Sequence, residues 1–132
     1  MKQITLTKSE KEIMTLLWNT DRPLTAAEIV NLTPERTWKK SYIHLLINSL
    51  IEKNMIQSES LVRTGRNFGR AFAATMTQEQ FLVLQITQSK NYTQEMIPVL
   101  VSALLNTATD LNVLQQTEEI IQSRKAILEQ TT

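Results

Sequence analysis

The chain has 132 residues, of which 42% are hydrophobic and 20% are charged, and its formal net charge is +1. A chain of this size can bury a core of its own but is short for two full domains. It contains no cysteine, which excludes disulfides, thiolate metal sites and a cysteine nucleophile. Its start has no apolar signal segment, and no apolar stretch approaches the roughly 20 residues of a membrane-spanning helix. We therefore expect a cytoplasmic protein with no membrane partner.

Basic residues are concentrated in the first part of the chain. Residues 1–76 hold 11 Lys or Arg against 7 Asp or Glu, whereas residues 77–132 hold 3 against 6. The segment 36–70 alone has a net charge of +5. Such a local excess is typical of a surface that binds nucleic acid, with chance clustering on a solvated surface as the alternative.

Helix starts are well marked. Thr7, Thr25, Thr77 and, in a looser form, Asn112 each stand three residues before Glu or Gln, the spacing of a capping box. In chain order, apolar spacing and turn residues predict helices at about 8–19, 26–31 and 40–53, then strands at about 55–62 and 68–75. A short strand near 23–24 could add a third member. Asn54 stands where a left-handed residue would end the third helix.

The third helix and the hairpin after it hold the candidate site. Its apolar stripe consists of Ile43, Leu46, Ile47, Leu50 and Ile51, so the remaining side chains face solvent. A solvent-facing helix with a basic start, beside an Arg-bearing hairpin, is what a winged helix needs to hold a DNA duplex. The predicted DNA-binding residues are Lys39, Lys40, Ser41, Tyr42, His44, Asn48, Arg63, Arg66 and Arg70. Partial burial of Tyr42, and arginines that only keep the hairpin soluble, are the alternatives.

The rest of the chain is patterned as helices at about 78–89, 95–107 and 113–129. Three short amphipathic helices have little of their own to fold against, so we expect a second copy of the chain to cover them; folding back on the first domain is the alternative. The predicted dimerisation residues are Ile97, Leu100, Val101, Leu104, Leu105, Leu114, Ile120, Ile121 and Leu128. The expected fold is mainly α with a small β-hairpin: a winged helix-turn-helix at 1–76, then a helical dimerisation region at 77–132.

These segments resemble the penicillinase-repressor family, which includes beta-lactamase, methicillin-resistance and copper-responsive repressors. The resemblance rests on LTKSEKEIMTLLW (Leu6–Trp18), PLTAAEIV (Pro23–Val30), Trp38, LLINSLIEKNMI (Leu45–Ile56), GRAFAATMTQEQF (Gly69–Phe81) and LVSALLN (Leu100–Asn106). It implies a winged helix, a helical dimerisation region and repression by homodimers on palindromic DNA operators. By position, Lys39 to Ser49 would be the recognition helix.

Other chemistry finds little support in the sequence. His44 is the only histidine, and no second nitrogen or sulfur ligand accompanies it, so neither a metal, a cofactor nor catalysis is expected. The cysteine pairs of the copper-responsive relatives are absent. The antibiotic-responsive relatives are cleaved at an Asn-Phe bond, where this chain reads Leu105-Asn106-Thr107. A winged helix that binds a protein, or a regulator with a small-molecule inducer pocket between dimer helices, remain the alternative functions.

Overall fold

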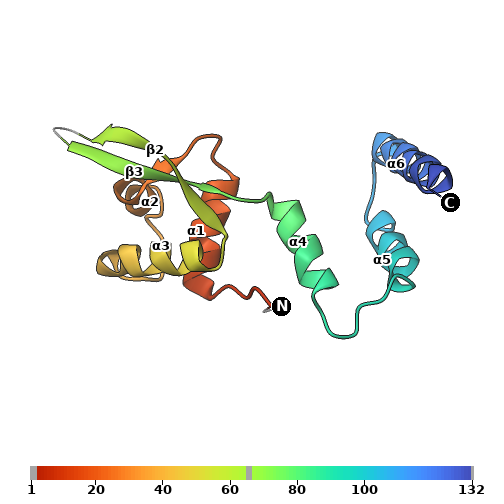
Figure 1. Cartoon of the computed structure of the whole chain (residues 1–132), viewed down its shortest axis with the longest axis horizontal. Coiled ribbons are helices and arrows are strands. Elements are labelled where there is room, and N and C mark those ends of the chain that lie inside the picture. The colour runs from red at the N-terminus through yellow and green to blue at the C-terminus, as the bar shows by residue number, and fades with distance from the viewer. Residues whose placement is uncertain (1–2, 65–66, 132) are drawn as a thin grey trace. The chain divides into compact units, whose positions relative to one another are not determined.

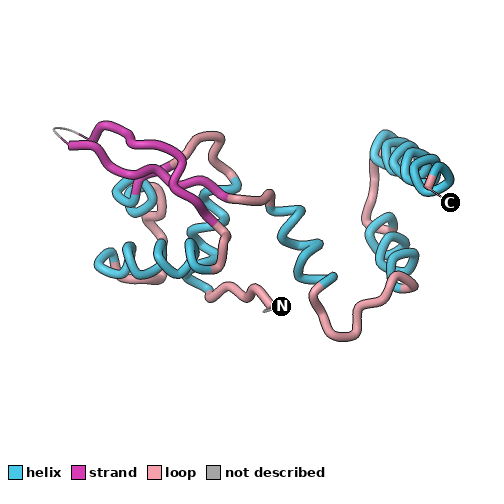
Figure 2. Tube along the Cα trace, viewed as in Figure 1, coloured by secondary structure: helices cyan, strands magenta, loops and turns pink. Residues whose placement is uncertain are grey.

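The computed structural model describes residues 3–64 and 67–131, with side chains omitted at positions 60, 62–64, 67 and 68. It divides into two compact units, Met1–Lys90 and Asn91–Thr132. The elements are drawn in Figures 1 and 2. In the first unit they are α1 (Lys8–Trp18), β1 (Leu24–Thr25), α2 (Ala26–Asn31), a 3-10 turn (Lys40–Tyr42), α3 (Ile43–Glu52), β2 (Ile56–Thr64), β3 (Asn67–Ala74) and α4 (Gln78–Thr87). In the second unit they are α5 (Met96–Leu105) and α6 (Leu111–Gln130).

The first unit is a winged helix, as predicted. Its strands form one antiparallel sheet in the order β1-β3-β2, so the short β1 completes the hairpin. The ladder between β2 and β3 pairs Ile56 with Ala74 and Leu61 with Arg70, and its register shifts between Ser58 and Ser60. Helices α1, α2 and α3 lie together on one side of the β2–β3 ribbon (Figure 1). The helix pair α2–α3 and the ribbon are thus presented by one scaffold.

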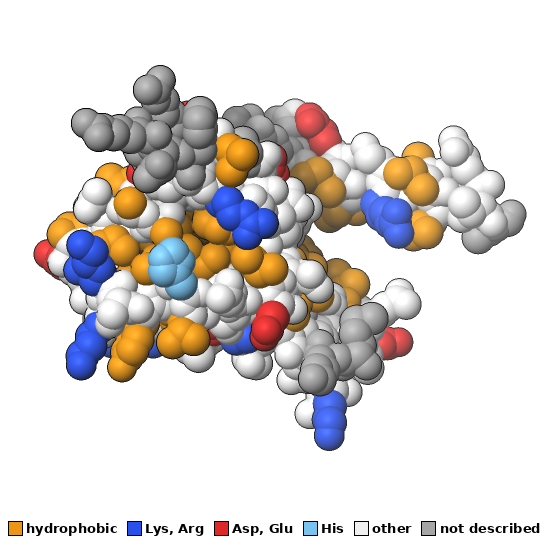
Figure 3. All heavy atoms as spheres, turned by 60° about the vertical axis from the view of Figure 1, so that its left-hand side comes forward, with side chains coloured by type: hydrophobic (Ala, Val, Ile, Leu, Met, Phe, Trp, Pro, Cys, Tyr) orange, Lys and Arg blue, Asp and Glu red, His pale blue; other side chains and the backbone are white. Residues whose placement is uncertain are grey.

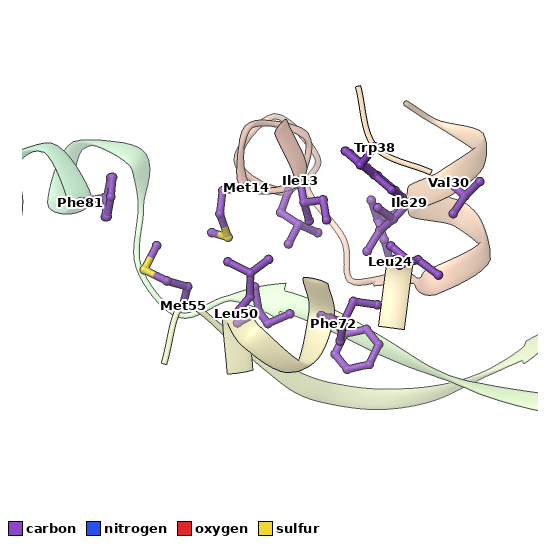
Figure 4. Packing of buried hydrophobic residues seen from close by; sticks show 14 residues of the cluster. Ile13, Met14, Leu24, Ile29, Val30, Trp38, Leu50, Met55, Phe72 and Phe81 are labelled. Atoms are coloured by element: carbon purple, nitrogen blue, oxygen red, sulfur yellow. The ribbon is translucent and has the colours of Figure 1, made fainter. Parts of the chain in front are cut away.

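The core of this unit joins the three strands to helices α1, α2, α3 and α4. Figure 4 shows buried side chains from α1, α2, α3 and the sheet turned toward one another. Ile13, Met14, Leu24, Ile29 and Leu50 have no accessible surface. The predicted stripe of α3 is confirmed, because Ile43, Ile47 and Leu50 are buried and Leu46 and Ile51 pack against them. Burial of this stripe fixes which face of α3 is turned outward.

Most of the predicted caps are confirmed. Thr7, Thr25 and Thr77 each accept a hydrogen bond from the backbone N–H three residues later, and the Glu or Gln there reciprocates. The prediction for Asn112 is wrong: α6 begins at Leu111, and the Asp110 carboxylate accepts from the Asn112 N–H at 2.9 Å. A carboxylate at the positive end of a helix is the better cap.

The end of α3 also agrees with the sequence. Asn54 has φ 59°, the left-handed conformation predicted for it. The Met55 N–H then donates to the Leu50 carbonyl at 2.9 Å, which satisfies a carbonyl at the helix end. The predicted start is less regular, because residues 40–42 form a 3-10 turn that no side chain caps.

Helix α4 packs within the first unit. Phe81 is buried, and its ring lies 5.6 Å from that of Trp18, whose Nε1 donates to the Met76 carbonyl at 3.0 Å. Gln88 also exchanges hydrogen bonds with the backbone of Ile4. The sequence predicted a boundary between residues 76 and 77, with DNA binding before it and dimerisation after it. The packing of α4 does not test which residues dimerise, so this boundary remains a prediction.

The second unit consists of α5 and α6, and neither helix has a buried residue. No described helix is both long enough and apolar enough to span a membrane.

Candidate nucleic-acid interface

The outward face of α3 and the segment that leads into it carry the side chains that the sequence predicted as DNA contacts. Lys39, Lys40, Ser41, Tyr42, His44 and Asn48 are all exposed. Tyr42 retains 48% of its accessible surface, so partial packing leaves its outer part available to a ligand. Within the described part of the chain, neither lysine has an ion-pair partner. This end of α3 is therefore a cationic surface open to solvent.

A buried carboxylate holds α3 against α1. Glu10 is 1% exposed, and its carboxylate accepts hydrogen bonds from Lys53 Nζ and Ser49 Oγ, both at 2.7 Å. It also accepts from the Thr7 backbone N–H at 2.8 Å, as part of the α1 capping box. Burial alone would raise the pKa of Glu10, but the hydrogen bonds from Lys53, Thr7 and Ser49 outweigh it and lower that pKa. One charged group thus ties the start of α1 to the last turn of α3.

The sequence indicated only part of this network. Glu10 was recognisable as the capping partner of Thr7, because that contact spans three residues. Its contacts with Ser49 and Lys53 span 39 and 43 residues. The available signal was that α1 buries one face, on which the first-turn Glu10 also lies.

The segment before α3 is held by a second contact with α1. The Glu12 carboxylate accepts from the Thr37 N–H at 3.0 Å and from the Thr37 hydroxyl. Trp38 is buried, and the Arg36 guanidinium lies 5.6 Å from the centre of its ring. Among the described residues, Trp38 Nε1 has no hydrogen-bond partner. These contacts hold in place the segment that leads into Lys39, Lys40 and helix α3.

A groove separates α3 from β3. It has a volume of about 390 Å³, and His44 and Asn48 line it from α3 while Arg70 lines it from β3. A second depression, of about 720 Å³, lies between α2 and the start of α3 and is lined by Lys40, Ser41 and His44. Figure 3 shows this face, with the chain's single histidine among hydrophobic side chains and with basic side chains nearby. The fold therefore brings together five of the predicted DNA-binding residues.

The wing contributes Arg70, which is exposed and faces Leu61 across the ladder. Within the described residues Arg70 has no ion-pair partner. Arg63 belongs to β2 by its backbone, but its side chain lies outside the described part. Arg66 also lies outside the described residues. Their assignment to the DNA surface remains a prediction.

Residues 6–123 match the family model described as penicillinase repressor. The chain belongs to the penicillinase repressor family. The repressor is accordingly a DNA-binding transcriptional regulator, and the relatives that define its family are regulators, not enzymes. No curated protein matches its sequence significantly.

Several solved structures are similar to the repressor. PadR of Bacillus subtilis in complex with operator DNA has 16% sequence identity, with 91% of this chain and 72% of that chain covered and a TM-score of 0.46. A zinc-responsive MarR family member, ZitR of Lactococcus lactis, has 16% identity, coverage of 99% and 80%, and a TM-score of 0.45. MarR of Staphylococcus aureus in complex with salicylate and kanamycin has 14% identity, coverage of 96% and 76%, and a TM-score of 0.45.

The residues proposed for dimerisation of the repressor all keep accessible surface. Ile97, Leu104, Ile120, Ile121 and Leu128 are exposed, whereas Leu100, Val101, Leu105 and Leu114 are partly buried. Apolar side chains outside this predicted set are exposed as well: Leu82, Val83 and Ile86 on α4, Val99 on α5, and Leu111, Val113 and Ile127 on α6. Leu104 is 68% exposed. Apolar surface on this scale is characteristic of a protein interface.

A metal site is not visible in the described part of the repressor, which holds no group of three or more His, Cys, Asp or Glu suited to one. His44 lines the two depressions beside α3, and the chain has no second histidine to bind a metal with it. The arrangement is instead suited to polyanion binding, because cations and hydrogen-bonding side chains share one exposed helix face.

Proposed function

We propose that the repressor acts as a homodimer that binds an operator with two-fold symmetry and blocks transcription. Helix α3 of each copy would enter the major groove, and the wing would follow the phosphate backbone. A two-fold dimer presents the same helix twice, so it recognises two half-sites in opposite orientation. Double-stranded DNA is thus the proposed partner, in the cytoplasm, with neither a catalytic step nor a cofactor.

The dimer is supported by one observation above all: α5 and α6 bury none of their residues against each other in the second unit. Their exposed side chains are mainly aliphatic, and transferring such surface from water stabilises an interface by roughly 25 cal/mol per Å². A second copy of the chain offers the same surface, so one symmetric contact could cover both.

The proposed DNA face is supported by its charge and its rigidity. Lys39, Lys40 and Arg70 suit phosphate contacts, while His44 and Asn48 can donate or accept hydrogen bonds at base edges. The Glu10 network ties α3 to α1, so the backbone of the helix that carries His44 and Asn48 is held in place before DNA binds. Preorganisation of this kind lowers the entropic cost of association.

Selection of bound fragments from genomic DNA, followed by titration at several salt concentrations, tests the proposal. We expect an enriched sequence with two inverted half-sites and an affinity that falls steeply with salt, because phosphate contacts release counterions. Enrichment of no sequence, or an affinity for DNA that is insensitive to salt, would contradict it. The latter result would favour a winged helix whose apolar surface binds a protein.

A further inference from the structure

An apolar side chain lies on the outward face of α3, in the first turn of the helix. Leu45 is 67% exposed. It follows the buried Ile43 by two positions and precedes the buried Ile47 by two. At about 100° per residue, this spacing turns it to the far side of the helix from the core. Unlike its neighbour Leu46, Leu45 does not pack against the core cluster.

Single exposed leucines are common on protein surfaces and need no special account. The surroundings of Leu45 distinguish it. Lys39 and Lys40 precede it, just before and in the 3-10 turn that leads into α3, and Arg70 lies across the groove that Asn48 lines. A surface so framed by cations is complementary to a polyanion, and the family of this chain binds DNA. A DNA duplex is the occupant whose charge fits the face around Leu45.

We propose that Leu45 reads the C5-methyl group of a thymine in the major groove, so that each half-site carries an A·T pair beneath the first turn of α3. This inference rests on the proposed function and names what its reading helix recognises. Thymine is the only base that presents a methyl group in the major groove. Leucine has no donor or acceptor, so it gains from covering that methyl. Covering the cytosine amino group would instead leave a polar group without a partner.

Asn48 supports this placement. It follows Leu45 by three residues and is also exposed. Side chains at this spacing are neighbours on a helix surface, with Cβ atoms about 5–6 Å apart. Base pairs stack about 3.4 Å apart, so the two side chains reach the same or adjacent pairs. Asparagine pairs well with adenine N6 and N7, which is also consistent with A·T content at this point.

The test removes the methyl group without changing any hydrogen-bonding group of the base. Each thymine of the selected operator is replaced singly by uracil, and the affinity of the full-length protein is measured. At one position in each half-site we expect a loss of about fourfold, the equivalent of roughly 0.8 kcal/mol for one buried carbon group. Leu45→Ala should bind the thymine operator more weakly and should no longer distinguish uracil there. Leu45→Met, which keeps an apolar chain, should retain most of the distinction.

A matched control lies in the wing. Leu61 is 68% exposed, almost the same as Leu45, but belongs to β2. A wing that follows the backbone or the minor groove meets no C5-methyl, because the minor groove does not display it. Leu61→Ala should therefore keep the full penalty for uracil. Both variants change exposed residues, so their melting temperatures should stay within about 3 °C of the parent.

The outcomes separate this inference from the proposed function. If the operator is bound with steep salt dependence but no uracil substitution weakens it, Leu45 does not read a methyl, although the DNA function stands. Persistence of the uracil penalty in Leu45→Ala overturns the inference as well. If no duplex is bound more tightly than random DNA, both the inference and the proposed function fail.

Discussion

Glu10→Gln isolates the charge that ties α1 to α3. Glutamine keeps the size of the side chain, and its one amide oxygen can still accept from the Thr7 backbone N–H. Its amide NH2, in the place of the second carboxylate oxygen, can donate to the Ser49 hydroxyl but cannot accept from it. The ion pair with Lys53 Nζ, now at 2.7 Å, is lost. A hydrogen bond to a charged group contributes about 1.5–3 kcal/mol. The Lys53 side chain is 30% exposed and can partly regain water, which moderates the loss. We expect the free energy of unfolding to fall by about 2 kcal/mol at pH 7.

The pH dependence has a definite sign. The pKa of Glu10 is lowered in the folded state, because hydrogen bonds from Lys53, Thr7 and Ser49 outweigh the opposing effect of burial. The stability that it contributes is therefore fully present above its ordinary pKa of 4.5 and is lost as pH falls through the folded-state pKa. The difference in the free energy of unfolding between the parent and Glu10→Gln should therefore become smaller as the pH falls through this acidic range.

Urea unfolding at a series of pH values measures both effects, and Glu28→Gln is the matched control. Glu28 occupies the same capping-box position in α2 and pairs with Arg22 at 2.7 Å, but the Arg22 side chain is 54% exposed. The pKa of Glu28 is lowered as well, mainly by the hydrogen bond from the Thr25 backbone N–H and to a lesser extent by Arg22. An exposed pair of this kind contributes about 1 kcal/mol or less. Two results would refute the reasoning. One is an equal loss of unfolding free energy in the two variants. The other is a difference between the parent and Glu10→Gln that stays constant as the pH falls.

Three further predictions concern the assembly, the DNA face and metals. Leu104→Asp should shift the sedimenting species from dimer toward monomer, because an unpaired charge buried in the interface is costly. Thr109→Asp, the control, should leave the dimer intact. A native protein that sediments as a monomer at micromolar concentration would refute the dimer. Arg70→Ala should weaken binding to the operator and to random duplex by similar factors, and should reduce the slope of log affinity against log salt concentration by about one unit per half-site. Tyr42→Ala and His44→Ala should instead weaken binding to the operator more than binding to random DNA, by roughly 1–3 kcal/mol. Equal losses on both duplexes for the Tyr42 and His44 variants would show that these residues do not read sequence. One equivalent of copper or zinc should leave operator affinity almost unchanged, because a single histidine without cysteine is a poor ligand set; release of the operator by metal would contradict this.

Local signals in the sequence were sufficient for most of the winged helix. The apolar stripe of α3, the caps at Thr7, Thr25 and Thr77 and the left-handed Asn54 depend on contacts within a few residues. The family resemblance is confirmed by the match over residues 6–123. Sequence spacing alone also identified the outward face of α3, since fixing the buried stripe fixes its opposite.

What the sequence did not reveal depends on contacts between distant segments. The charge of Glu10 is matched by Lys53, 43 residues away, and no periodicity indicates such a pair. Packing of Phe81 against Trp18, which attaches α4 to the first unit, is equally remote in sequence. At α6 the spacing of Asn112 favoured a capping box, but the nearby Asp110 caps the helix instead. Competition between two neighbouring capping side chains is decided by backbone geometry.

The central claim is that two copies of the chain each place α3 in one half of a symmetric operator. Titration of the selected operator against a version with one half-site scrambled tests it most directly, with stoichiometry measured by sedimentation of the complex. We expect two chains per intact duplex. Scrambling one half-site should reduce affinity by roughly a hundredfold or more, because several mismatched base pairs, each costing about 1–3 kcal/mol, sum to at least about 3 kcal/mol. One chain per duplex, or equal affinity for the intact and half-scrambled operators, would contradict the account.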